Sequence, residues 1–333
     1  MKRWTHRPEG STWGDWGEDD QLGRLNLLTP ARVLRASREI LTGERFCLSL
    51  PLDYPGGSVL APHRKPPQLA PTMRSGRPFA NYAFGQEGPF CDCGNDDIVT
   101  LCTQYSTQWD SLAHIGCRFD AHGTGQERMT YYNGYAETDI VAPGEPGKAT
   151  MPLGIQTMAA AAIQGRGVMV DLHAHLGAQR RRVGYDTLME IFEADGLAVE
   201  EGDILCLHTG FAERLLSMEG KPDLSVLNNA CAVLDGTDER LLQWVGASGV
   251  AAIVADNYAV EGFIPVIGLT PRPMVPLHVH CLFKLGVPLG ELWHLTPLAE
   301  HLRHHKRFRF FLSAPPLRLP GAVGSPVTPI ATV

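Results

Sequence analysis

The stretch Gln104-Tyr-Ser-Thr-Gln108-Trp-Asp110-Ser-Leu-Ala-His114 carries four polar side chains, spaced 4, 2 and 4 residues apart. A strand that turns into a loop near Asp110 would point these side chains into one small volume. A carboxylate, an imidazole and two amide oxygens that meet there can bind a hard or borderline cation. We therefore predict that this stretch forms part of a metal site.

The same residues allow a structural interpretation. Glutamine is a poor metal ligand because its amide is neutral and weakly basic, whereas tight zinc sites use anionic or imidazole donors. In a polar edge strand, Gln104 and Gln108 would hydrogen-bond the backbone and Asp110 would cap the next turn. From these residues alone, both interpretations stay open.

The segments around this stretch predict an α/β fold. Residues 97–104 have the pattern of a strand that delivers the polar stretch at its end. Further along, apolar runs that end in polar residues alternate with segments of helical periodicity. This alternation predicts a layered α/β core with a ligand site at the strand ends. The predicted strands are 167–171, 203–208 and 250–256, and the predicted helices between them are 185–194 and 238–248.

The two ends of the chain are predicted to be less regular than its middle. Residues 1–90 form a loop-rich N-terminal arm and extension, with a helix over 30–41 and a long ordered loop over 54–88. Residues 313–333 are rich in proline, which predicts one last strand followed by a Pro-rich C-terminal extension. We find no internal repeat, and we expect one domain over residues 1–333.

Composition excludes several classes of protein. The 333 residues are 44% hydrophobic, enough to bury a large core, and the net charge is −7. No lysine or arginine run or basic stripe in the chain suggests a nucleic-acid footprint, so we expect no nucleic-acid partner. It has no apolar run near the roughly 18 residues needed to cross a bilayer, so we expect no membrane partner. The basic N-terminus lacks an apolar stretch behind it, which predicts a cytoplasmic protein whose cysteines are reduced.

Three histidines near the ends of predicted strands, His173, His175 and His208, are not expected to be metal ligands. Asp171-Leu-His173-Ala-His175 ends a predicted strand and is similar to the paired histidines of amidohydrolase barrels, but in those barrels the pair comes early in the chain. We expect this pair to be structural or to line a substrate pocket. His208 also ends a strand, where a packed and hydrogen-bonded imidazole is expected. No Gly-x-Ser-x-Gly motif is present, which disfavours a serine hydrolase.

The chain resembles the metal-dependent cyclase family, which includes bacterial kynurenine formamidase and isatin hydrolase. The family signature is His-x-Gly-Thr-His-x-Asp-x-x-x-His, and both leading histidines are glutamines here. The resulting pattern, Gln-x-x-x-Gln-x-Asp-Ser-x-x-His, is similar to the branch that contains trans-dienelactone hydrolase. Three further segments carry the resemblance, which spans roughly residues 13–300: Trp13 to Pro30, Tyr132-Asn133-Gly134, and Gly202 to Gly210.

The resemblance implies a swivelling β/β/α fold that assembles as a homodimer or homotetramer. It also implies a metal centre in which His114 carries a proton to the leaving group, histidine being the side chain that titrates near neutrality. The cofactor is expected to be a divalent ion, Mn²⁺ or Zn²⁺. Two amides in place of imidazoles shift the preference towards Mn²⁺ and allow one ion instead of two. The implied ligands are Gln104, Gln108 and Asp110 for the first ion, and Asp110, His278 and Glu291 for the second ion or the remaining positions.

Two histidines compete for the ligand position before Glu291. In the family, a histidine precedes the glutamate by 12 or 13 residues and stands before a Leu-Leu pair, which matches Cys281-Leu282 here. This match places the ligand at His278. His280 lies about 200° around a helix from His278 and would face away from the metal.

The resemblance implies a hydrolase that uses metal-activated water to open a lactone, a cyclic amide or a formamide bond of a small molecule. Three side chains are candidates for substrate contact: Trp109 and Tyr132 by stacking on a ring, and Arg118 by pairing with a carboxylate. The alternative function is a non-catalytic small-molecule binder that kept the family fold and lost its metal. The two glutamines motivate this alternative.

Overall fold

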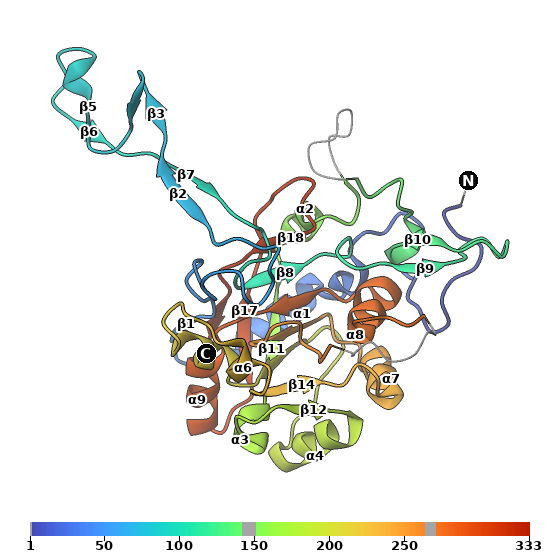
Figure 1. Cartoon of the computed structure of the whole chain (residues 1–333). Coiled ribbons are helices and arrows are strands. Elements are labelled where there is room, and N and C mark those ends of the chain that lie inside the picture. The colour runs from blue at the N-terminus through green and yellow to red at the C-terminus, as the bar shows by residue number, and fades with distance from the viewer. Residues whose placement is uncertain (1, 142–150, 264–270) are drawn as a thin grey trace.

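The computed structural model describes residues 2–141, 151–263 and 271–333. In these ranges, nine strands form one curled sheet through the centre of the molecule (Figure 1). Their order across the sheet is β1 (Arg45–Cys47), β19 (Ile330–Thr332), β17 (Arg309–Ser313), β11 (Gln164–Asp171), β13 (Ile204–His208), β15 (Ala252–Ala255), β16 (Leu289–Glu291), β8 (Gln108–Asp110) and β18 (Gly324–Pro326).

Four neighbouring strands in the middle of the sheet, β11, β13, β15 and β16, run parallel. Every residue of β13 and β15 is buried, because both faces of the sheet are covered. Strands buried on both faces are continuously apolar instead of alternating, which is why they stand out in the sequence as apolar runs. The strands predicted at 167–171, 203–208 and 250–256 are confirmed as β11, β13 and β15, and the α/β fold class with them.

Helices cover both faces of the sheet. Apolar residues of α4 (Tyr185–Asp195) and α7 (Glu239–Ser248) pack into the hydrophobic core on one face. Those of α2 (Ile155–Ala160) and α9 (Thr296–His304) pack into the core on the other face. The helix predicted over 30–41 begins at Pro30 but ends at Ala36 and continues as a 3₁₀ turn, η2 (Ser37–Glu39). The described α-helices are α1 (Pro30–Ala36), α2 (Ile155–Ala160), α3 (Leu172–Leu176), α4 (Tyr185–Asp195), α5 (Phe211–Leu216), α6 (Leu224–Leu227), α7 (Glu239–Ser248), α8 (Pro276–His278) and α9 (Thr296–His304).

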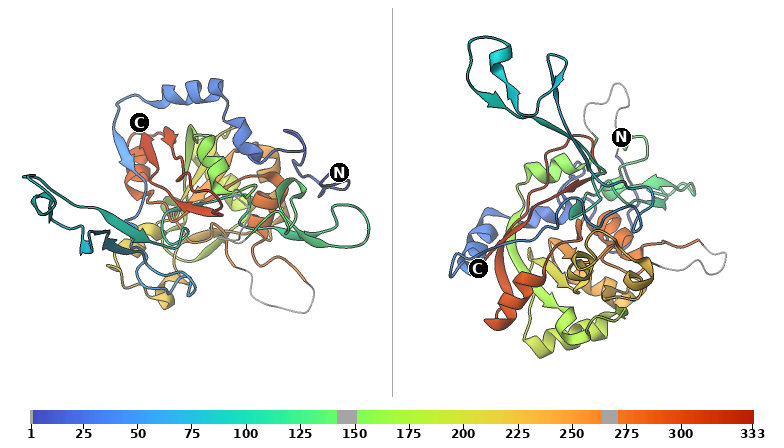
Figure 2. Two further views of the ribbon diagram at one scale, coloured as in Figure 1. Left: turned by 90° about the horizontal axis from the view of Figure 1, so that it is seen from above. Right: turned by 60° about the vertical axis from the view of Figure 1, so that its left-hand side comes forward.

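A ribbon of short strand pairs projects from the body of the molecule in every view (Figures 1 and 2). We call residues 68–100 the arm; this segment is distinct from the N-terminal arm and extension predicted over residues 1–90. The strand predicted at 97–104 ends at Thr100 and belongs to this arm, so the prediction that it delivers the polar stretch is wrong. A local pattern identifies a strand but not the strand with which it pairs. The pairs of the arm are β2 (Gln68–Pro71) with β7 (Asp97–Thr100), β3 (Met73–Arg74) with β4 (Arg77–Pro78), and β5 (Tyr82–Ala83) with β6 (Cys93–Gly94).

The arm exposes large apolar side chains. Leu69 is 73% exposed, Met73 is 64% exposed and Ile98 is 55% exposed. A two-stranded ribbon is marginally stable by itself in water, and clustered exposed apolar residues often mark a contact surface. Assembly as a homodimer or homotetramer stays a prediction, and the arm is the surface on which a contact with a second copy is expected.

The C-terminal residues belong to the main sheet. β18 pairs with β8, and β19 pairs with β1 and β17. The side chains of Ala331 and Val333 are buried. The segment 313–333 is therefore part of the core layer rather than an extension from it, and most of its prolines lie in the links between strands. None of the described helices is long and apolar enough to span a bilayer.

Candidate metal centre

The polar stretch lies on β8, which is paired on both sides, with β16 and with β18. Successive side chains of a strand point to opposite faces of the sheet. Gln108 and Asp110 therefore share one face, and Trp109 points to the other. Glu291 of β16 lies directly opposite Gln108 in the antiparallel register, so its carboxylate is on the face that carries Asp110.

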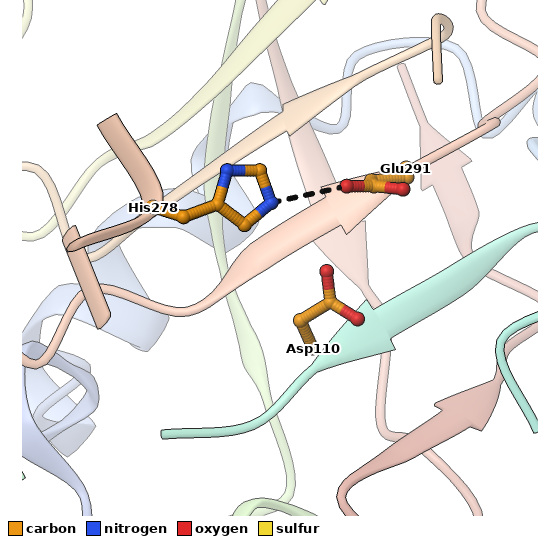
Figure 3. Close-up of side chains that lie close together, drawn as sticks. All are labelled: Asp110, His278 and Glu291. Atoms are coloured by element: carbon orange, nitrogen blue, oxygen red, sulfur yellow. Dashed lines mark hydrogen bonds and ion pairs between the residues drawn. The ribbon is translucent and has the colours of Figure 1, made fainter. Parts of the chain in front are cut away.

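His278 completes a cluster with these carboxylates from outside the sheet. It is the last residue of α8, a single turn that begins with Pro276 and leads directly into a π-helix, η5 (Val279–Leu285). The ligand atoms of Asp110, His278 and Glu291 lie within 4.8 Å of one another (Figure 3), and the three residues are 0%, 3% and 4% exposed. Two carboxylates and an imidazole at this spacing form a donor set suited to a divalent cation.

Glu261 fixes the orientation of the His278 ring. Its Oε1 lies 2.9 Å from His278 Nδ1 and accepts the backbone N–H of His278 at 2.8 Å, and its Oε2 accepts the N–H of Leu277 at 3.0 Å. With Nδ1 donating to Glu261, Nε2 faces Glu291, 3.3 Å from Oε1. A carboxylate behind a ligand histidine sets its tautomer and raises its basicity. Sequence reasoning missed Glu261 because no local pattern relates it to His278, 17 residues later.

The two glutamines bring amide nitrogens to the carboxylates. Gln104 Nε2 donates to Asp110 Oδ1, and Gln108 Nε2 donates to Asp110 Oδ1 at 3.3 Å and to Glu291 Oε2 at 3.2 Å. Gln108 Oε1 and Asp110 Oδ2 are buried without a hydrogen-bond partner in the described part of the chain. Such atoms are rare in proteins, and a cation would satisfy Asp110 Oδ2. For the amide oxygens to bind metal, the amide groups would have to turn over, so their role as ligands stays a prediction.

The cluster concentrates negative charge away from water. Two carboxylates that lie within 4.8 Å of each other repel by about 3.5 kcal/mol or more at an effective dielectric constant of about 20. Burial raises the pKa of Asp110, with the Glu291 charge adding to this and the His114 and His278 charges opposing it. Burial also disfavours the charged form of Glu291, but the hydrogen bond and the charge of His278 outweigh it and lower the pKa of Glu291.

His278 holds a proton that a metal ion would replace. Burial lowers the pKa of His278, but its hydrogen bonds to Glu261 and Glu291 outweigh burial and raise the pKa to about 10. A divalent cation between Asp110, His278 and Glu291 would take the place of this proton and cancel the repulsion between the carboxylates. These residues therefore fit a divalent ion in geometry, burial and charge.

His114 lies at the rim of the cluster. Its Nδ1 is 3.2 Å from Gln104 Nε2, and its ring centre is 6.4 Å from that of His278. The residue is half-buried. His280 does not join the cluster: its Nε2 is buried without a partner among the described residues, and burial lowers its pKa to about 4. The structure thus brings His278, and not His280, to the carboxylates.

Trp109 belongs to the hydrophobic core on the opposite face of the sheet. It is fully buried, and its ring packs edge-on against Trp293 with ring centres 5.1 Å apart. Its Nε1–H donates to the backbone carbonyl of Ala314 at 2.8 Å. Strand alternation separates this ring from the side chains of Gln108 and Asp110, so its position does not support the expected contact with a substrate.

Arg118 and Tyr132 are also placed away from the carboxylates. Arg118 lies on the hairpin of β9 (Cys117–Phe119) and β10 (Arg128–Thr130), where its side chain is 74% exposed and 3.8 Å from Glu127. Tyr132 is fully buried, and its hydroxyl lies 3.4 Å from Thr12 of the N-terminal segment. Neither residue is brought to the metal cluster by a described contact, and Tyr132 has the environment of a core residue.

Two comparisons with known proteins decide the family. The model of the Cyclase family matches residues 46–262 of this chain. A solved structure of a novel cyclase is 30% identical to it, with a TM-score of 0.77 and a coverage of 97% of both chains. The chain belongs to the cyclase family. The resemblance to the cyclase family that the sequence indicated is thereby confirmed.

More distant structures share this cyclase-family fold. Isatin hydrolase A from Labrenzia aggregata is 12% identical, with a TM-score of 0.57 over 90% of this chain and 95% of its own. Isatin hydrolase A from Ralstonia solanacearum is 15% identical, with a TM-score of 0.57 over 91% of this chain and 97% of its own. At this identity the likeness shows the fold alone. No curated protein matches the chain.

Proposed function

We propose that this cyclase-family protein is a metal-dependent hydrolase that opens a lactone, a cyclic amide or a formamide bond with water. The observation that carries the proposal is the buried convergence of Asp110, His278 and Glu291, with one carboxylate oxygen left without a partner in the described structure. Buried ionisable groups with shifted pKa values cluster at functional sites. Isatin hydrolases share the fold, which makes a cyclic amide one of the bonds to test.

We infer that His278 Nε2 and the carboxylate oxygens of Asp110 and Glu291 hold a divalent ion. When bound, such an ion lowers the pKa of water and polarises a carbonyl oxygen. The cluster offers two carboxylates and a single imidazole, because Gln104 and Gln108 stand where the family signature has histidines. This donor set favours an ion that prefers oxygen ligands. We therefore propose Mn²⁺ ahead of Zn²⁺ as the cofactor.

Hydrolysis also requires the movement of one proton. The oxygen of water is added to the acyl carbon, the bond from that carbon to the leaving oxygen or nitrogen breaks, and the leaving atom takes a proton. We assign this transfer to His114. Its Nδ1 accepts a hydrogen bond from Gln104 Nε2. The proton of the neutral ring is then on Nε2, and no described residue accepts a hydrogen bond from this N–H. Nε2 can give this proton to the leaving atom and recover one from the attacking water.

A non-catalytic binding protein is the second candidate. The observation that favours it is that the amide nitrogens of Gln104 and Gln108 already donate to the carboxylates, which partly satisfies the cluster without a cation. A protein that binds a small molecule without metal would keep this network as it is. The two candidates differ in a measurable property, because only the hydrolase requires a metal ion.

Elemental analysis of the purified protein, followed by thermal unfolding with and without Mn²⁺ and Zn²⁺, tests the proposal. The hydrolase should contain or take up about one ion per chain, and the ion should raise Tm by mass action. Asp110→Asn removes a ligand at nearly constant volume and should lose both effects. The loaded protein is then assayed on lactones, cyclic amides and formamides. No uptake of metal would favour the binding protein, and uptake without hydrolysis of any of these bonds would overturn the hydrolase.

A further inference from the structure

A small pocket adjoins the metal cluster. Two of its lining residues, Tyr105 and Leu292, directly follow Gln104 and Glu291 in the chain, so the pocket and the cluster share backbone. Most of the remaining lining comes from the loop over 55–64. The volume of the pocket is about 10 Å³, which is the space for one water-sized group. Such a pocket has space for one oxygen atom of a ligand rather than for a ring.

Arg64 is the charged residue in the lining of this pocket. Its Nη1 donates to the backbone carbonyl of Gln104 at 2.6 Å, which holds the guanidinium beside the cluster. Burial raises the pKa of Glu291 and nearby cations lower it, the Arg64 charge among them. Burial also raises the pKa of Tyr258, another lining residue, and the Arg64 charge opposes that rise. The positive charge therefore acts on both the pocket and the cluster.

Arg64, which is half-buried, lacks the acidic partner that the more deeply buried Arg166 has. Arg166, which is 7% exposed, binds both oxygens of Asp203, at 2.8 and 2.9 Å. In the described part of the chain, no carboxylate pairs with Arg64, whose side chain has the single hydrogen bond to Gln104. A guanidinium has five N–H donors and stays charged in proteins. Arg64 is therefore an anion-binding group to which no carboxylate of the described residues is paired.

We propose that Arg64 binds a carboxylate of the substrate, so that the enzyme acts on lactones or cyclic amides that carry an acidic group. This inference rests on the proposed hydrolase function. The scissile carbonyl would lie at Asp110, His278 and Glu291, and the acidic group would lie against Arg64 with one oxygen in the small pocket. Two buried carboxylates would otherwise repel an anionic substrate, and a fixed guanidinium both offsets this repulsion and sets the orientation of the substrate.

One pair of compounds tests the proposal: 3-oxocyclopentane-1-carboxylate and 3-oxocyclopentane-1-carboxamide. They have the ring size of a lactone, lack a hydrolysable ring bond and differ mainly in charge. Titration calorimetry measures their dissociation constants for the Mn²⁺-loaded protein. We expect the carboxylate to bind about 10- to 100-fold more tightly than the carboxamide, because its hydrogen bonds with the guanidinium are between charged groups.

Variants of Arg64 should change this ratio of dissociation constants in a graded way. Arg64→Ala should bring the ratio close to one. Arg64→Lys keeps the charge and a donor for Gln104 but loses the planar fork, so its ratio should be intermediate. Arg240→Ala is the matched control, because Arg240 is exposed and already pairs with Asp186 at 2.8 Å, and the ratio should stay at the wild-type value.

Three results would overturn the proposal: a wild-type ratio near one, a preference for the carboxylate that survives Arg64→Ala, or no binding of either compound. The second result would mean that the carboxylate binds the metal or another site. Turnover of lactones with and without an acidic group is measured separately. An Arg64-dependent binding ratio without turnover of any lactone or cyclic amide would count against the hydrolase and leave the carboxylate site in place.

Discussion

Two buried clusters of acid and histidine lie in this molecule, and their hydrogen bonding differs. We call Asp171, His208, Thr296 and Arg303 the Asp171 cluster, and Asp110, His278 and Glu291 the Asp110 cluster. In the Asp171 cluster, Asp171 Oδ1 is 2.7 Å from His208 Nδ1, and His208 Nε2 is 3.0 Å from Thr296 Oγ1. Asp171 Oδ2 accepts two hydrogen bonds from Arg303, at 2.7 and 2.9 Å. Each carboxylate oxygen and ring nitrogen of this cluster has a partner.

The Asp110 cluster has similar residue types but incomplete hydrogen bonding. Asp110 Oδ2 has no partner in the described structure, and a second carboxylate faces it. Burial raises the pKa of Asp110. Burial acts in the same direction on Asp171, but its hydrogen bonds to His208 and Arg303 outweigh burial and lower the pKa to about 2. A buried acid–histidine pair is thus structural where its hydrogen bonds are complete, and suited to a cation where an oxygen is left over.

Asp110→Asn should show the largest functional difference between the two clusters. A bound ion contributes several kcal/mol to the transition state, so loss of a ligand should lower kcat/KM by about 10³-fold. Metal content by elemental analysis and initial rates on the substrate measure the effect. Asp171→Asn is the matched change and should lower Tm while metal content and rate are kept. An Asp110→Asn protein that retains its metal and its rate would remove the distinction between the clusters.

Glu261→Gln should weaken metal binding without removing a ligand. The amide no longer supplies the negative charge that orients His278 and raises its basicity, so metal affinity should fall about 10- to 100-fold. Competition with a chromophoric chelator measures this affinity. Glu300→Gln, at an exposed position of α9, is the control and should bind metal as tightly as the wild type. Equal affinity in the Glu261 variant would mean that His278 is not a ligand.

Metal affinity of the Asp110 cluster should rise with pH. Burial lowers the pKa of His278 from its ordinary 6.5, but the hydrogen bonds to Glu261 and Glu291 raise it to about 10, so a metal ion must displace a proton below that pH. Affinity should therefore increase about tenfold per pH unit, measured by chelator competition at pH values of about 6, 7 and 8. Because folding raises the pKa of His278, its proton also stabilises the metal-free fold. This contribution to the free energy of unfolding is fully present below pH 6.5 and is lost as pH rises through about 10. An affinity that does not change with pH would contradict the assignment of His278.

Thr296→Val should have the smallest effect of these changes. It removes one hydrogen bond to His208 in the Asp171 cluster, so the free energy of unfolding should fall by about 1 kcal/mol, as measured by denaturant titration. Metal affinity should not change. Thr328→Val, at an exposed position, is the control and should stay within about 0.5 kcal/mol of the wild type. A change of metal affinity in the Thr296 variant would mean that the two clusters are coupled.

The central strands could be predicted from the sequence, whereas their partners could not. β11, β13 and β15 are apolar runs bounded by polar residues, which is a local pattern. The pairing of β7 with β2 in the arm, and of β8 with β18 from the C-terminal segment, joins residues that are distant in sequence. Strand periodicity carries no information on such partners, so the pattern of residues 97–104 indicates a strand but not its place in the arm.

The site shows the same division between local and tertiary information. Trp109 could have been excluded from the sequence, because strand alternation turns it away from its two polar neighbours on β8. Glu261 and Arg64 could not have been found, since they reach the cluster only through the folded chain. Arg64 comes from a loop rich in proline and glycine, where no periodicity predicts the direction of a side chain.

The π-helix η5 gives the segment before Glu291 a tolerance for changes in length. A π-helical turn holds one residue more than an α-helical turn. Deletion of one residue between Val279 and Leu285 would convert the turn into an α-helix and leave His278 at its start and Gly286 at its end. Relatives are therefore expected to differ by one residue in the spacing of this histidine and glutamate, which is 13 residues here. An alignment that forbids a gap in this helix would misplace the histidine by one position.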